Sequence, residues 1–247
     1  MSVADILRTL LGRRGESRSD AHSRDGARAA PTPSPGRTGR ALLDGQSALI
    51  VGAGMNVGLG IARELAREGA TLCITNMADD DLASVARALH VDGVDALAVR
   101  SDVAAAGSED ALVAQLDEHG MTPDILVLNV GVRAATGEPD VAEMERVFRT
   151  NVIAPLHLAR RVAVRMQSSG RGGTILFVTS IHQWSLFGDA LYSASKAAVG
   201  MVVRELAAEL ASARIRVNAI APGWVASGDR NQIDETIETK VHGPHVQ

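Results

Sequence analysis

The chain has 247 residues, enough for one large domain or two small ones, and 46% of them are hydrophobic, which allows a substantial core. The formal net charge of −4 gives no reason to expect nucleic acid as a partner, and no apolar run approaches the roughly 20 residues that span a membrane. A single cysteine, Cys73, excludes an internal disulfide and suits a reducing compartment, so we expect a cytoplasmic protein.

The first 43 residues differ in composition from the rest of the chain. Residues 1–40 contain eight Arg against four Asp and Glu, a charge of +4, whereas the remainder has 17 basic and 25 acidic residues, a charge of −8. Apolar residues between positions 3 and 11 have helical spacing, but the Gly-, Ser-, Pro- and Arg-rich stretch after them has little to bury. We predict a disordered tail over 1–43, with a docking or membrane-surface helix at its start as the alternative, and one domain over 44–247.

Short apolar runs alternate with amphipathic segments from Asp44 onwards. The expected strands are 47–52, 71–76, 96–102, 124–131, 173–180 and 215–223. The expected helices are 58–70, 80–90, 108–120, 140–168 and 191–212. This alternation predicts an α/β fold, a doubly wound (Rossmann-type) parallel sheet with helices on both faces. Its ligand site should lie at the carboxyl ends of the strands.

The segment GAGMNVG, residues 52–58, joins the first expected strand to the first helix, and we call it the glycine turn. Such a turn lets a phosphate approach backbone N–H groups at the positive end of a helix. The spacing Gly-x-Gly-x-x-Gly is absent, because Gly54 is followed by a glycine at 58 and not at 57. By itself the glycine turn fits a phosphate site and a plain tight turn of small residues equally well.

Tyr192 is the only tyrosine, and Lys196 is one of two lysines in a chain that otherwise uses arginine for its positive charges. Residues four positions apart share one face of a helix. An ammonium about 4 Å from a partly buried phenol favours the phenolate by roughly 4 kcal/mol at an effective dielectric near 20, which would lower a phenol pKa of about 10 by about three units. The pair predicts a tyrosine general acid/base, and an incidental pair on a surface helix is the alternative.

The order of these motifs resembles that of the classical short-chain dehydrogenase/reductase family, over about residues 44–227. The family turn reads Thr-Gly-x-x-x-Gly-x-Gly; Gly52 and Gly58 match it, whereas Val51 replaces the threonine and Asn56 the middle glycine. Asparagine tolerates positive φ better than other non-glycine residues, so the turn should survive. The missing threonine hydroxyl removes a hydrogen bond that steadies the turn, and we expect weaker pyrophosphate binding.

The resemblance implies a nicotinamide cofactor held by the glycine turn, by the ends of successive strands and by the tyrosine helix. The implied residues are Gly52, Met55, Asn56, Val57, Gly58, Asn76, Asp102, Val103, Asn129, Gly131, Tyr192, Lys196, Pro222, Gly223, Val225 and Ser227. The Asp102 side chain and the Val103 backbone would contact adenine. Asn129 would help to shape the ribose site, and the Val225 backbone with Ser227 would meet the nicotinamide carboxamide.

Cofactor choice is expected to depend on the end of the second strand. Family members that prefer NAD often have aspartate where this chain has Asn76. Those that prefer NADP often have arginine where this chain has Met77, or a basic residue at the position of Met55. The acidic run at 79–81 would repel a phosphate, although it also fits a solvated helix start. We therefore expect NAD, with NADP as the alternative.

The resemblance also assigns four catalytic residues and requires no metal. Tyr192 would exchange a proton with the substrate oxygen, and Lys196 would lower the Tyr192 pKa and hold the nicotinamide ribose. Ser180 would donate a hydrogen bond to the substrate carbonyl. Asn151 would orient a water that joins Lys196 to solvent, helped by a helix irregularity before Pro155. The implied reaction is hydride transfer between the cofactor and a small secondary alcohol or ketone.

The spacing from serine to tyrosine departs from the family. Thirteen positions are usual; Ser180 lies twelve before Tyr192, and Thr179 has the usual spacing. We prefer Ser180, because a loop absorbs a one-residue deletion easily. The intervening loop should line the substrate pocket. Its histidine, His182, could contact the substrate, but a loop histidine is more often only a surface residue. The expected apolar lining is Trp184, Leu186 and Phe187.

The resemblance ends near Ser227. The family continues with a segment over the substrate, a helix and a final strand that helps to form a tetramer, but residues 228–247 hold no apolar run that could supply the strand. We expect the last strand to be missing, in a fragment or a natural truncation, which would leave 215–223 as an edge and the chain marginally stable. A homo-oligomer remains one of the expected alternatives. A non-catalytic dinucleotide-binding or interaction module is the alternative to the enzyme, although four intact catalytic positions favour the enzyme.

Overall fold

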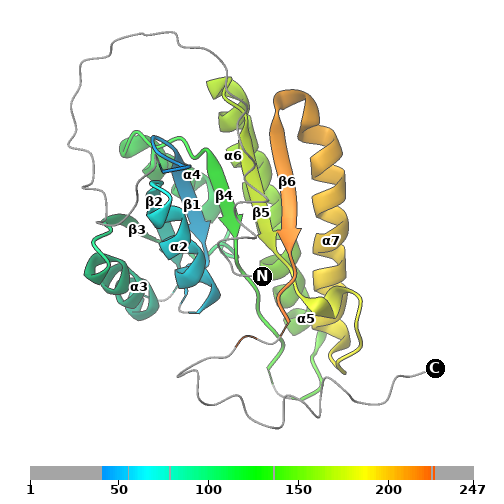
Figure 1. Cartoon of the computed structure of the whole chain (residues 1–247). Coiled ribbons are helices and arrows are strands. Elements are labelled where there is room, and N and C mark those ends of the chain that lie inside the picture. The colour runs from blue at the N-terminus through cyan, green and yellow to red at the C-terminus, as the bar shows by residue number, and fades with distance from the viewer. Residues whose placement is uncertain (1–40, 55, 78, 136, 224, 226–247) are drawn as a thin grey trace, which may run out of the picture.

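The computed structural model describes residues 41–54, 56–77, 79–135, 137–223 and 225. Its strands form one parallel sheet: β1 (Ser47–Val51), β2 (Thr71–Asn76), β3 (Ala96–Arg100), β4 (Ile125–Leu128), β5 (Gly173–Val178) and β6 (Ile215–Ile220). The strand order is β3-β2-β1-β4-β5-β6 (Figure 1). The predicted doubly wound sheet is confirmed. Its order reverses between β1 and β4, and a ligand crevice is expected at the carboxyl ends there.

Helices pack on both faces of the sheet. They are α2 (Val57–Arg67), α3 (Asp79–Val91), α4 (Ser108–Glu118), α5 (Val141–Phe148), α6 (Ala154–Ser169) and α7 (Ala190–Leu210). The described residues also form three short helical segments: the π-helix η1 (Arg149–Ile153) and the 3₁₀ segments η2 (Ile181–Gln183) and η3 (Ala211–Ala213). The helix expected at 140–168 is therefore divided, with η1 between α5 and α6.

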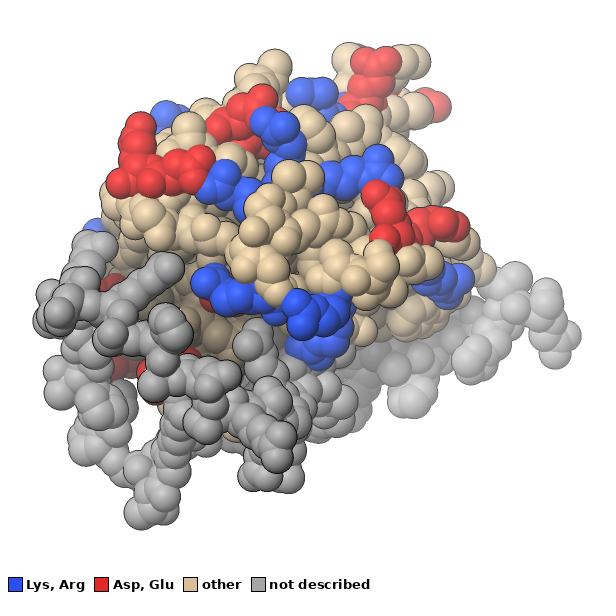
Figure 2. Space-filling view, turned by 90° about the horizontal axis from the view of Figure 1, so that it is seen from above, with Lys and Arg blue, Asp and Glu red and all other residues tan. Residues whose placement is uncertain are grey.

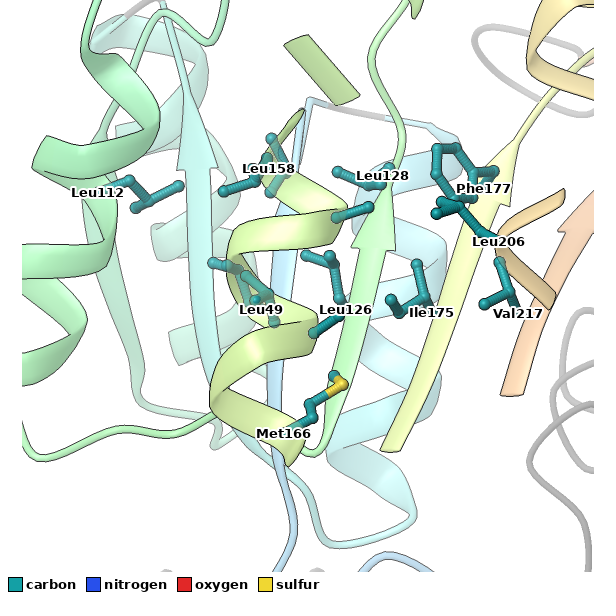
Figure 3. Packing of buried hydrophobic residues seen from close by; sticks show 14 of the residues in the cluster. Leu49, Leu112, Leu126, Leu128, Leu158, Met166, Ile175, Phe177, Leu206 and Val217 are labelled. Carbon is teal, nitrogen blue, oxygen red and sulfur yellow. The ribbon is translucent and has the colours of Figure 1, made fainter. Parts of the chain in front are cut away.

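Two apolar clusters, one on each face, hold the sheet and helices together. Leu49 of β1 points into the cluster shared with α4, α6 and α7, whereas its neighbour Ile50 points into the cluster shared with α2 and α3. Figure 3 shows the first cluster, in which Leu158 of α6 faces the sheet near Leu126 and Leu128. Strands covered on both faces must be apolar at nearly every position, which explains the continuous runs in the sequence.

Charged residues remain outside this core. Seen from above, acidic and basic side chains are interspersed and not separated by sign (Figure 2). Ion pairs such as Arg160–Glu209, 2.9 Å apart, are about half exposed, so each stabilises the fold by only about 0–1 kcal/mol. Within the described ranges, no helix has the length and apolar character of a membrane span, and no cluster of His, Cys, Asp and Glu could hold a metal ion.

The two ends of the expected domain are only partly described. Leu43, which the expected boundary leaves in the tail, is 3% exposed and belongs to the cluster beside α2 and α3. The domain therefore includes at least this residue, while the expectations for 1–40 lie outside the described residues. The expectations for Ser227 and for 228–247 also lie outside them. In the part of the chain that is described, β6 is one edge strand of the sheet.

Candidate active site

The glycine turn requires the absence of side chains at two positions. Gly52 has a φ of +76°, and a Cβ there would lie 2.6 Å from the Asn129 carbonyl oxygen. A Cβ at Gly58 would lie 2.9 Å from the backbone of the turn itself. The Gly52 N–H donates to the Thr75 carbonyl at 3.0 Å, which fixes the turn against β2. Both glycines that match the family pattern are thus needed for close backbone packing.

The turn is completed by two asparagines. Asn56 has a φ of +71°, the positive value that its replacement of glycine requires. The Asn129 side chain donates from Nδ2 to the Gly52 carbonyl at 2.7 Å and ties the end of β4 to the turn. The Asn129 side chain therefore holds the end of β4 against the glycine turn. The sequence did not reveal this tie.

The start of α2 is suited to an anion. No side chain of the described residues caps it, so its first backbone N–H groups face the turn without a side-chain acceptor. N–H groups at a helix start favour phosphate. The start of α2 can therefore accept an anion such as a phosphate. Met55, which was expected to contribute, lies outside the described residues.

The expected adenosine end lies at the ends of β2 and β3. The Asn76 Oδ1 accepts from the Met77 N–H at 2.8 Å, and the Asp102 Oδ1 accepts from the Ala104 N–H at 3.0 Å, so each side chain shapes its own turn. The Val103 side chain is buried in the core, which leaves its backbone as the expected contact. Sequence reasoning missed Arg100, which is the in-register neighbour of Asn76. The Arg100 Nε donates to the Met77 carbonyl at 3.4 Å.

A pocket of about 270 Å³ opens at the carboxyl ends of β4 and β5, beside the start of α7. It brings together nine of the expected residues: Val57, Asn129, Gly131, Ser180, Tyr192, Lys196, Pro222, Gly223 and Val225. Of these, Gly131 is spatially constrained, because a Cβ there would lie 2.9 Å from the Lys196 Nζ. Residues from the glycine turn, from the ends of three expected strands and from the tyrosine helix thus meet at one cavity, as expected for a doubly wound sheet.

Ser180 and Thr179 both line the pocket, and they differ in their hydrogen-bond partners. The Ser180 side chain is hydrogen-bonded to that of Tyr192. The Thr179 hydroxyl donates to the Ile220 carbonyl at 3.0 Å and accepts from the Gln183 side chain at 3.1 Å, so it is used in fixing the end of β5. The one-residue-shorter loop therefore still presents Ser180 to the tyrosine.

Lys196 is buried among backbone carbonyls. Its Nζ donates to the carbonyls of Val130, at 3.1 Å, and Val178, at 3.2 Å, and lies 5.6 Å from the centre of the Tyr192 ring. Burial lowers the pKa of Lys196 to about 8. The ammonium is therefore held between the ends of β4 and β5, close to the phenol but not bonded to it.

Burial raises the pKa of Tyr192 above its ordinary value. The nearby charge of Arg133 and the hydrogen bond from Ser180 lower it, while Asp189 raises it further. The expectation was a pKa lowered by Lys196. The structure differs because Lys196 is engaged with carbonyls and loses its own proton more readily when buried, whereas desolvation of the phenol favours its neutral form.

Asn151 does not line the pocket; it lies in the π-helix η1. Pro155, near the start of α6, has no N–H to bond the Asn151 carbonyl, and the Ala154 N–H bonds Arg149, five residues back. The predicted irregularity near Asn151 is confirmed. The buried Asn151 side chain bonds the Val132 backbone at both its N–H, 2.7 Å, and its carbonyl, 2.9 Å. Asn151 thus fixes the chain that follows β4.

The loop after Ser180 lines the pocket differently from the prediction. Trp184 and Leu186 are 68% and 85% exposed and do not contribute to the pocket, so that part of the prediction is wrong. Phe187 lines it and stacks at 4.4 Å on the ring of His182. His182, expected at the surface, is buried. The short η2 helix carries His182, and the exposed Trp184 follows it directly.

Sequence reasoning also missed Arg133 and Asp189. The Arg133 guanidinium lies 4.6 Å from the centre of the Tyr192 ring, and Asp189 caps the start of α7 through the Tyr192 N–H at 3.0 Å. Arg133 follows Gly131 by two positions, so its place just after a strand end was the available signal. The position of Asp189 three residues before Tyr192 was the signal for a helix cap.

Comparison with known proteins agrees with this geometry. Residues 46–238 match the family model described as short chain dehydrogenase. Galactitol 2-dehydrogenase from Agrobacterium fabrum is 37% identical over 188 residues, which cover 74% of this chain and 72% of that one. Ketoacyl reductase HetN from Nostoc sp. is 28% identical over 206 residues, 83% of this chain and 70% of that protein.

A solved structure is similar over most of the described fold. It is a 7α-hydroxysteroid dehydrogenase in complex with NADH and 7-oxoglycochenodeoxycholic acid. It superposes with a TM-score of 0.67 at 34% sequence identity, covering 73% of this chain and 71% of the other.

Proposed function

The chain belongs to the short-chain dehydrogenase family of oxidoreductases, and we propose that it transfers a hydride between a nicotinamide cofactor and a small secondary alcohol or ketone. The observation that carries the proposal is the meeting of Ser180, Tyr192 and Lys196 at one pocket beside the glycine turn. The similar proteins support the substrate class, since their names describe a ketoacyl reductase, a galactitol dehydrogenase and a hydroxysteroid dehydrogenase.

The dinucleotide would lie along the carboxyl edge of the sheet. The N–H groups at the start of α2 would bind its pyrophosphate, and Asp102 with the Val103 backbone would hold the adenine. Lys196 would hold the nicotinamide ribose, and the segment from Pro222 to Val225 would hold the nicotinamide end. When bound, the cofactor supplies or accepts the hydride.

Tyr192 and Ser180 would act on the substrate oxygen. In reduction, the Tyr192 phenol gives its proton to the oxygen while the Ser180 hydroxyl donates a hydrogen bond to it; in oxidation, the phenolate takes the hydroxyl proton back. Asn151 would keep its carbonyl, in the irregular helix, available to a water that connects Lys196 with solvent. The proton lost by Tyr192 can then be replaced.

A screen for turnover tests this proposal. Ketones and secondary alcohols are offered with NADH, NADPH, NAD and NADP, and the change in reduced-nicotinamide absorbance is followed. Turnover that disappears in the Tyr192→Phe variant supports the proposal. Tight binding of the cofactor without turnover of any carbonyl or alcohol would instead favour a binding module.

Ser180→Ala is expected to lower kcat by about 100-fold, because it removes a hydrogen bond to the charge that develops on the substrate oxygen. Thr179→Val is the matched control. It removes a hydroxyl that bonds Ile220, and we expect nearly unchanged kcat with a loss of about 1 kcal/mol in the free energy of unfolding. Steady-state kinetics and urea unfolding measure both. A larger kcat loss in Thr179→Val would transfer the role to Thr179.

We expect NADH to bind at least as tightly as NADPH. Arg100 lies at the expected ribose end, but it is engaged with the Met77 carbonyl, and the sequence is acidic at 79–81, which opposes a phosphate. Met77→Arg should move the preference towards NADPH by about 10-fold, as expected for one charge-assisted phosphate contact of about 1.4 kcal/mol. Fluorescence titration with both cofactors measures the Kd values.

Arg100→Gln serves as the second variant for cofactor choice. If NADH is preferred as expected, this substitution should leave the ratio of the two Kd values nearly unchanged. A wild-type protein that binds NADPH more tightly, and loses this preference in Arg100→Gln, would show that Arg100 binds the 2′-phosphate and that the expectation is wrong.

A further inference from the structure

Arg133 occupies an unusual place for a half-exposed arginine. Its guanidinium carbon lies 4.6 Å from the centre of the Tyr192 ring, within the range of a cation–π contact, and its side chain helps to line the pocket. None of the four expected catalytic residues is an arginine. The charge beside the phenol ring thus comes from the loop that follows β4.

Two side chains hold the Arg133 guanidinium in this position. One nitrogen lies 3.0 Å from the His182 Nε2, and another lies 3.5 Å from the Asp189 carboxylate. Asp189 also accepts from the Tyr192 N–H, through its other oxygen. The same carboxylate therefore fixes the start of the helix that carries Tyr192 and the cation that lies over its ring.

The backbone around Arg133 is fixed as well. The Arg146 side chain donates to the Arg133 carbonyl at 2.9 Å, and the neighbouring Val132 is bonded on both sides by the buried Asn151. Exposed arginines normally lose much side-chain entropy when held in one geometry, which makes isolated surface pairs weak. Here the guanidinium itself has two side-chain partners, in addition to the fixed backbone.

We propose that Arg133 is a positioning residue that supplies a second positive charge to Tyr192 and favours the phenolate, with Asp189 and His182 holding it over the ring. The inference rests on the proposed acid/base role of Tyr192, which it deepens. It assigns to the loop after β4 the role of favouring the Tyr192 phenolate by charge, a role that Lys196 alone does not fill in this arrangement.

The distribution of charge explains why a second cation matters. Burial lowers the pKa of Lys196 to about 8 and raises that of Tyr192, so Lys196 is already losing its charge where the phenol begins to ionise. A guanidinium keeps its charge throughout this range. Arg133 is accordingly the larger of the two influences that lower the Tyr192 pKa, ahead of the hydrogen bond from Ser180.

The remaining groups that face Tyr192 are consistent with this role. His182 meets the Tyr192 ring edge-on at 5.0 Å, and burial, with the charge of Arg133, lowers the His182 pKa. A neutral His182 can accept from Arg133 at Nε2 while its Nδ1 bonds the Ser193 hydroxyl at 3.1 Å. Asp189 opposes the phenolate but is partly neutralised by Arg133 itself.

The single tyrosine makes a direct test possible. Tyrosinate absorbance, recorded against pH over the range in which circular dichroism shows the fold intact, reports on Tyr192 alone, and Tyr192→Phe gives the blank. Arg133→Gln and Arg133→Met should each raise the midpoint by about one pH unit. Arg63→Gln is the control, since Arg63 is also about half exposed and pairs with Asp92 at 2.6 Å, away from the pocket; it should leave the midpoint unchanged.

The outcomes separate this inference from the proposed function. In a protein that turns over an alcohol, the pH at which kcat for oxidation is half-maximal should rise in Arg133→Gln by the same amount as the tyrosinate midpoint. A shifted midpoint in a protein without turnover would support the inference and contradict the function. Midpoints equal to wild type in both Arg133 variants would overturn the inference. If, with these unchanged midpoints, only the KM for acidic substrates rises, Arg133 binds a substrate anion instead, and the inference is overturned in that case too.

Discussion

Replacing Tyr192 with phenylalanine is expected to lower kcat by about 1,000-fold while the Kd for NADH stays within about twofold of wild type. The substitution removes the only phenol in the chain and with it the transferable proton, and general acid/base groups contribute about 10²–10⁴-fold. The ring itself remains, so Arg133 and His182 keep their contacts with its face and edge. Steady-state kinetics beside a fluorescence titration measure the two quantities.

The matched control for Tyr192→Phe is a change that removes a hydroxyl away from the pocket. Ser212 is exposed in η3, directly after the end of α7, whereas Tyr192 lies near the start of that helix. Ser212→Ala should therefore leave both kcat and Kd unchanged. If Tyr192→Phe retained more than a few per cent of wild-type kcat, another group would have to handle the proton, and the assignment of Tyr192 would be wrong.

Gly52→Ala is expected to abolish measurable NADH binding and to lower the free energy of unfolding by about 3 kcal/mol. An L residue at the observed φ of +76° costs about 1–2 kcal/mol, and the new Cβ would overlap the Asn129 carbonyl at 2.6 Å, which adds about 1–3 kcal/mol. Moving the turn to relieve this overlap would also break the 2.7 Å bond from Asn129 to Gly52. Urea unfolding and fluorescence titration test the two effects.

Gly60→Ala, in the α2 helix that follows the turn, is the control for Gly52→Ala. A Cβ at Gly60 meets no heavy atom within 4 Å, so we expect a gain of about 0.5–1 kcal/mol from the higher helix propensity of alanine. Wild-type stability and NADH affinity in Gly52→Ala would show that the turn yields easily and that its close approach to β4 is not required.

The sequence was sufficient for the fold because the signals for it are local and repeated. Apolar runs such as residues 47–51 alternate with amphipathic segments. A strand that is covered on both faces must be apolar at nearly every position, so its sequence pattern is easily recognised. The same holds for Asn56, whose positive φ follows from its replacement of a glycine. Tyr192 and Lys196 could be paired from their spacing alone, since a helix places residues four apart on one face.

Only the tertiary structure decided how these residues are surrounded. Arg133 reaches His182, 49 residues away, and Asn129 reaches Gly52, 77 residues away, because parallel strands end at one edge of the sheet. The direction of the Tyr192 pKa shift depends on burial and on every neighbouring charge, and neither can be read from the spacing of Tyr192 and Lys196. Periodicity along the chain determined which elements form, and packing between distant elements determined which charges meet at the phenol.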